Sequence, residues 1–148
     1  MLLSEHFTLE EMTFSTLGSR RRIDNSPNAE QLANLAVLAQ SLERIRSVLG
    51  KPIHIDSGFR SAKLNAAVGG SKNSAHMDGR AADFVCPQYG SPKDICEAII
   101  DAEIVFDQLI CEGTWVHFSI SKPETEPRGD ILTAHFGQGG TTYTKGIV

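Results

Sequence analysis

The sequence predicts one α+β domain in which a small antiparallel sheet has helices packed on one side. The chain has 148 residues, of which 41% are hydrophobic and 22% are charged, as is typical of one globular domain with its own core. One long segment carries apolar residues at helical spacing, and several short segments alternate between apolar and polar residues as strands do. Neither a repeat nor a low-complexity linker interrupts the chain, so residues 1–148 are treated as a single domain.

The clearest predicted helix lies between Ser26 and Gly50. A capping segment with an early proline precedes it, and a glycine closes it. Its apolar residues recur at spacings of three and four: Leu32, Leu35, Leu38, Leu42, Ile45 and Leu49. Apolar and polar residues alternate over Pro52–Ser57, which predicts a strand that ends at Gly58. A short helix is predicted at residues 61–68, before two glycines.

The second half of the chain predicts strands separated by a helix. Residues 71–77 are polar and rich in turn formers, so we expect a loop that carries His76 into a strand at 81–85. A helix is predicted from Pro92 to Ala102, with Ser91 as its cap. A last strand is expected near 131–135, followed by a glycine-rich tail.

A β-hairpin is predicted from two strands at 108–112 and 115–121, joined by Gly113-Thr114. A two-residue turn would place Glu112 opposite Trp115 and Ile110 opposite His117. Because side chains alternate along a strand, Glu112 would then share a sheet face with His117.

Composition and charge exclude several classes of function. The net charge is −4 and the one dense basic run, Arg20-Arg21-Arg22, is short, so no nucleic-acid partner is expected. No apolar run approaches the roughly 20 residues that span a bilayer, and the amino terminus lacks the pattern of a secretory signal. We therefore expect synthesis in a cytoplasm, no membrane insertion and, by default, a monomer.

The three cysteines, Cys86, Cys96 and Cys111, lie in apolar surroundings without CxxC spacing. They predict neither a disulfide framework nor a cysteine metal site, and we interpret them as small buried hydrophobic residues.

Two histidines and an aspartate form the candidate metal site: His76, Asp83 and His117. Catalytic zinc sites typically have three protein ligands of these kinds and keep the fourth position for water or substrate. The donor set is therefore the right size for a catalytic zinc ion and one ligand short for a closed structural site.

Three motifs resemble the zinc D-Ala-D-Ala peptidases of family M15: S-x-H-x-x-G-x-A-x-D at 74–83, W-x-H at 115–117 and S-G-F-R-S at 57–61. The resemblance implies the hedgehog/DD-peptidase fold, with zinc held by His76, Asp83 and His117. It also implies that Arg60 binds and polarises the substrate, which would be a peptidoglycan peptide. A structural ion pair of Arg60 with Asp56 or Glu112 is the alternative.

The sequence departs from this family at the general base. Many relatives carry an acid three residues before the last histidine, where this chain has Thr114. A threonine cannot replace a carboxylate, so the hairpin geometry makes Glu112 the predicted base. Asp56 and His54 are the other candidates.

The expected function is zinc-dependent hydrolysis of peptide bonds in bacterial peptidoglycan. The small size, the absence of a signal sequence and the absence of a wall-binding module resemble a bacteriophage endolysin, which acts on the wall after release. A D,D-carboxypeptidase or dipeptidase acting on small D-Ala-D-Ala substrates is one alternative. A non-catalytic, zinc-stabilised binding module is another, and the Thr114 departure keeps it open.

Overall fold

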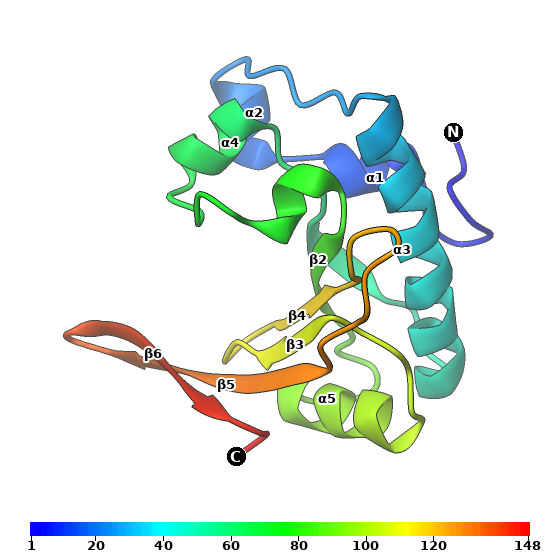
Figure 1. Cartoon of the computed structure of the whole chain (residues 1–148), viewed down its shortest axis with the longest axis vertical. Coiled ribbons are helices and arrows are strands. Elements are labelled where there is room, and N and C mark those ends of the chain that lie inside the picture. The colour runs from blue at the N-terminus through cyan, green and yellow to red at the C-terminus, as the bar shows by residue number, and fades with distance from the viewer.

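The computed structural model describes residues 1–148 and has one six-stranded sheet with the strand order β1-β2-β4-β3-β5-β6 (Figure 1). Neighbouring strands are antiparallel except for β3 and β5, which are parallel. The strands are β1 (His54–Ser57), β2 (Ala81–Val85), β3 (Gln108–Cys111), β4 (Val116–Ser119), β5 (Asp130–Gly137) and β6 (Gly140–Lys145). The α+β prediction is confirmed, and the parallel pair is the one departure from an antiparallel sheet.

Two predicted helices, α3 (Ala29–Leu49) and α5 (Pro92–Asp101), pack against one face of this sheet (Figure 1). Asn28 caps α3 in a capping box, and Gly50 ends it with a left-handed φ of 66°. Ser91 caps α5 in the same way. The leucine and isoleucine stripe predicted for the long helix is buried, apart from half-buried Leu32: Leu35, Leu38, Leu42, Ile45 and Leu49.

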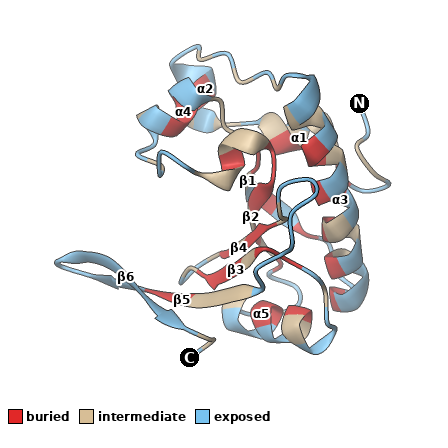
Figure 2. Ribbon diagram, in the orientation of Figure 1, coloured by how far each residue is buried: buried red, intermediate tan, exposed pale blue.

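The central strands separate a buried face from a functional face. Phe84 on β2 and Phe118 on β4 belong to the core cluster that α3 and α5 complete. Figure 2 shows buried segments on these strands and helices. Asp83 and His117 alternate with them and therefore lie on the opposite face. This alternation keeps the polar site residues out of the hydrophobic core.

The chain also has four short helical segments: α1 (Leu9–Thr13), α2 (Thr16–Arg20), α4 (Ala62–Ala67) and the 3-10 helix η1 (Ala75–Asp78). Helix α1 contacts β1, η1 contacts β2, α4 contacts η1, and α2 lies next to α4. Helix α4 was predicted, whereas η1 replaces part of a predicted loop. Helices α1 and α2 were not predicted, because five residues are too few to show a helical repeat.

The predicted glycine-rich tail is wrong. Residues 140–145 form β6, which pairs with β5 in an extended hairpin that leaves the body of the protein (Figure 1). Every residue of β6 is exposed (Figure 2), so no apolar alternation marks it as a strand. The predicted last strand at 131–135 corresponds to the middle of β5.

The predicted hairpin is confirmed in its register: Ile110 pairs with His117, and the Glu112 backbone N–H donates to the Trp115 carbonyl. Gly113 has a φ of +81°, as a glycine at the first turn position allows. The three cysteines are buried and unpaired, as predicted. None of the helices combines the length and apolar character that crossing a membrane requires.

Candidate metal centre

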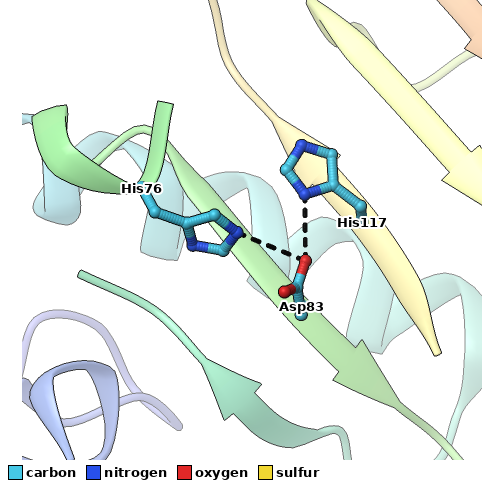
Figure 3. A group of neighbouring side chains, drawn as sticks. All are labelled: His76, Asp83 and His117. Carbon is cyan, nitrogen blue, oxygen red and sulfur yellow. Dashed lines mark hydrogen bonds and ion pairs between the residues drawn. The ribbon is translucent and has the colours of Figure 1, made fainter. Parts of the chain in front are cut away.

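Three side chains from three separate segments converge on the face of the sheet opposite the hydrophobic core (Figure 3). His76 comes from η1, Asp83 from β2 and His117 from β4, and one ligand atom of each lies within 4.8 Å of the others. His76 Nε2 lies 3.3 Å from Asp83 Oδ1, and His117 Nδ1 lies 2.9 Å from the same oxygen. The structure therefore brings together all three residues predicted as metal ligands.

Local structure accounts for this convergence. Asp83 and His117 are direct cross-strand partners, so their side chains meet on one face. His76 reaches them from η1, where the Ser74 hydroxyl caps the helix by accepting a hydrogen bond from the His76 backbone N–H. Gly79 ends η1 with a φ of 76°, which turns the chain into β2.

The tautomer of His76 is fixed by its environment. Its Nδ1 lies 2.7 Å from the Gly58 carbonyl oxygen, which can only accept, so Nδ1 carries the proton. The lone pair of Nε2 therefore faces the Asp83 carboxylate across 3.3 Å, and Nε2 is buried without a hydrogen-bond partner. Two acceptors in this position require a cation between them, and a metal ion satisfies that requirement.

The protonation states also suit metal binding. Burial lowers the pKa of the His76 imidazole, which favours the neutral form. Burial by itself would raise the pKa of the Asp83 carboxyl, but its close contacts with the imidazoles of His76 and His117 outweigh burial and hold this pKa well below its usual value. A neutral imidazole and an ionised carboxylate are the forms that bind metal.

Arg60 borders the three ligands. Its Nη2 lies 3.7 Å from Asp83 Oδ2, and its Nη1 donates to Asn65 Oδ1 at 3.0 Å. It forms no ion pair with Asp56 or Glu112, the alternatives left open by the sequence. Arg60 also lines a cavity of about 410 Å³, together with Asp56 and Ser57.

Glu112 lies at the end of β3, on the same face as its partner Trp115 and as His117. Burial raises the pKa of its carboxyl, the charge of His117 lowers it, and the charge of Asp83 raises it. A half-buried carboxylate with a raised pKa is a suitable proton acceptor. Its role as the general base stays a prediction.

The other base candidates are placed less favourably. His54 and Asp56 contact each other at 3.5 Å on the edge strand β1, where both side chains are exposed. Thr114 lies in the exposed hairpin turn and donates its backbone N–H to the Glu112 carbonyl.

Two residues that support the site were not identified from the sequence. A Cβ on Gly58 would lie 2.3 Å from the Met12 carbonyl oxygen, so only glycine permits this approach and the hydrogen bond to His76. Asn65 is buried, accepts from Arg60 and donates to the Ser71 carbonyl. The place of Gly58 within the S-G-F-R motif was a signal that could have identified it. No pattern in the sequence marks Asn65.

Comparison with known proteins supplies a family. A model of the family described as peptidase M15 matches residues 5–119. The zinc D-Ala-D-Ala carboxypeptidase of Streptomyces albus G is 48% identical over 53 residues, which is 35% of this chain. That match covers 21% of the length of the relative.

Proposed function

The chain belongs to the peptidase M15 family, and from this membership and the site we propose that it is a zinc peptidase that hydrolyses peptide bonds of peptidoglycan. The observation that carries the proposal is the buried His76 Nε2, whose lone pair faces Asp83 beside His117. These three residues would hold the zinc ion, and they leave its fourth position for water or substrate.

Zinc in such a site supplies Lewis-acid chemistry that activates water and polarises a peptide carbonyl. Glu112 accepts the proton of the attacking water and returns it to the leaving amine. Arg60 donates hydrogen bonds to the carbonyl oxygen as negative charge develops on it. Asn65 and Ser57 hold the guanidinium in place for this task.

The name of the matched relative supports D-Ala-D-Ala as the scissile bond. The sequence supports two further proposals. The protein would act as an endolysin-like enzyme of bacteriophage type, and it would be released to the cell wall after synthesis in a cytoplasm. Both concern where the enzyme acts and leave the chemistry of the site unchanged.

The decisive experiment is digestion of purified peptidoglycan by the zinc-loaded protein, with mass spectrometry of the freed termini. We expect new amine and carboxyl termini at one type of peptide bond, and none with His76→Ala. A parallel assay with soluble D-Ala-D-Ala peptides separates a carboxypeptidase from an enzyme that requires the polymer. Stoichiometric zinc with no new termini from either substrate would refute the peptidase proposal and favour a binding module.

A further inference from the structure

The hairpin of β5 and β6, here called the arm, leaves the body of the protein and carries exposed aromatic side chains. Phe136 is 58% exposed and Tyr143 is 51% exposed, although both are large apolar residues. The arm lies beyond residue 119, where the match to the family model ends. Its function therefore has to be inferred from the structure of this chain.

Strand register places the aromatic side chains on the same sheet face as the metal ligands. Ile110 pairs with both His117 and Leu132, so Leu132 lies on that face. Phe136 follows at an even spacing along β5, and it is paired across the arm with Thr141. Tyr143 pairs with Ala134 and so shares the face.

Contacts connect the arm to the hairpin that carries His117. The rings of Trp115 and Phe136 lie 6.2 Å apart at an angle of 46°. A Cβ on Gly113 would lie 2.8 Å from the Phe136 ring, so the turn and the ring pack directly against each other. Trp115, Phe136 and Tyr143 form what we call the aromatic face.

Glu112 links the aromatic face to the site. Burial raises the pKa of the Tyr143 hydroxyl, and the nearby negative charge of Glu112 raises it further. Glu112, the proposed base, also donates its backbone N–H to the carbonyl of Trp115, so the aromatic face begins next to this carboxylate and runs outward along the arm. A substrate held at the metal centre can extend onto it.

The aromatic face is uncharged. At the root of the arm Lys145 and Asp130 neutralise each other at 2.8 Å. Beyond that pair, the residues on this side of the arm are apolar, aromatic or hydroxylic: Leu132, Ala134, Phe136, Thr141 and Tyr143. Such a surface offers no unpaired cation to the carboxylates of stem peptides, whereas the apolar faces and hydroxyl groups of sugar rings can pack on it and hydrogen-bond to it.

We propose that the aromatic face binds the sugar rings of the peptidoglycan glycan strand while an attached peptide lies at the metal centre. The proposal rests on the proposed function of the site and names the second part of its substrate. The apolar side of each sugar ring would pack on Phe136 and Trp115. Its hydroxyl groups would exchange hydrogen bonds with Tyr143 and Thr141.

Binding to peptide-free glycan strands, measured by isothermal titration calorimetry, tests the proposal without requiring catalysis. We expect saturable binding that weakens at least tenfold in Phe136→Ala and in Tyr143→Ala. Thr142→Ala is the matched control, because Thr142 is paired with His135 on the opposite side of the same strands. Circular dichroism of each variant confirms that the arm substitutions leave the fold intact.

Three results would overturn the proposal: no binding to glycan strands, equal binding by all variants, or binding of free stem peptides that is lost in the two aromatic variants. The peptidase proposal is tested separately with soluble peptides. Phe136→Ala should slow the digestion of intact peptidoglycan far more than the hydrolysis of such a peptide. Loss of both activities in Phe136→Ala would show that the arm supports the metal site rather than the glycan.

Discussion

At the residue scale, His76 illustrates how one side chain links the fold to the site. Its Nδ1 hydrogen is bound by the Gly58 carbonyl, which orients the ring, and its Nε2 faces Asp83. The approach of Gly58 to α1 is possible only because this residue has no Cβ. The geometry of the candidate ligand therefore depends on a glycine 18 residues earlier in the chain.

We predict that His76→Ala abolishes stoichiometric zinc binding and lowers kcat/KM by at least about a hundredfold, because the site keeps only two ligands. Zinc content by atomic absorption and peptide hydrolysis check this. His135→Ala is the control, because His135 is exposed and contacts Thr144 on the arm. Full zinc content and activity in His76→Ala would refute the site.

We predict that Glu112→Gln lowers kcat by about 10²- to 10⁴-fold, the usual contribution of a general base, while zinc content stays unchanged. Thr114→Ala should retain activity, because Thr114 lies in the exposed turn. Steady-state kinetics with zinc-loaded protein measure both. If the Glu112→Gln enzyme stayed active, Asp56 or His54 would become the candidate for the general base.

At the element scale, the turn between β3 and β4 sets the geometry of the site. It fixes the register that brings Glu112 and His117 to one face, and it supports Phe136 of the arm. The segment between β4 and β5 is held in place by a different set of contacts. Asp107 accepts hydrogen bonds from the backbone and guanidinium of Arg128 there.

We predict that Gly113→Ala destabilises the protein by about 1 to 3 kcal/mol, because alanine at a φ of +81° is strained and its Cβ would lie 2.8 Å from Phe136. Urea unfolding measures the loss. Gly139→Ala is the matched control, since Gly139 has a negative φ and open space around it. Equal stability of both variants would contradict the predicted strain.

The Asp107–Arg128 pair predicts a pH dependence of stability. Burial by itself raises the pKa of Asp107, but the hydrogen bonds and charge of Arg128 outweigh it and the pKa is lowered. The pair therefore stabilises the fold above the unfolded pKa of about 3.9, and this contribution is lost as the pH falls through the lower folded value.

For Asp107→Asn we expect a loss of about 1 to 2 kcal/mol at pH 7 that shrinks as the pH falls below about 4. Urea titrations of both proteins across this range provide the check. If the difference in unfolding free energy between the two proteins stayed constant with pH, the ionised form of the Asp107 carboxylate would not be the source of the stabilisation.

At the scale of the whole molecule, the metal centre joins segments that are distant in sequence. Its residues come from η1, β2 and β4, while α3 and α5 pack on the other face of the sheet. A bound ion would therefore connect parts of the fold that separate on unfolding.

We predict that zinc at about 100 times its Kd raises stability by about 2.7 kcal/mol, or Tm by roughly 5 to 10 °C for a domain of this size. Differential scanning calorimetry with zinc and with a chelator measures the shift. His76→Ala should show no shift, and an equal shift in that variant would indicate binding elsewhere.

The sequence determined the helices α3 and α5, the register of the β3–β4 hairpin and the identity of the residues that meet at the metal centre. These features depend on local signals: apolar repeats, caps, turn residues and motif spacing. Such signals arise because one face of each of these elements is buried and the other is exposed.

Only the tertiary structure decided the parallel pairing of β3 with β5, the short helices α1 and α2, and the arm. Pairing between distant strands leaves no local pattern, and a strand exposed on both faces has no apolar alternation. It also decided that Arg60 lies beside Asp83 rather than pairing with Asp56 or Glu112. Burial and long-range contact settle these features, and neither is a property of a short stretch of sequence.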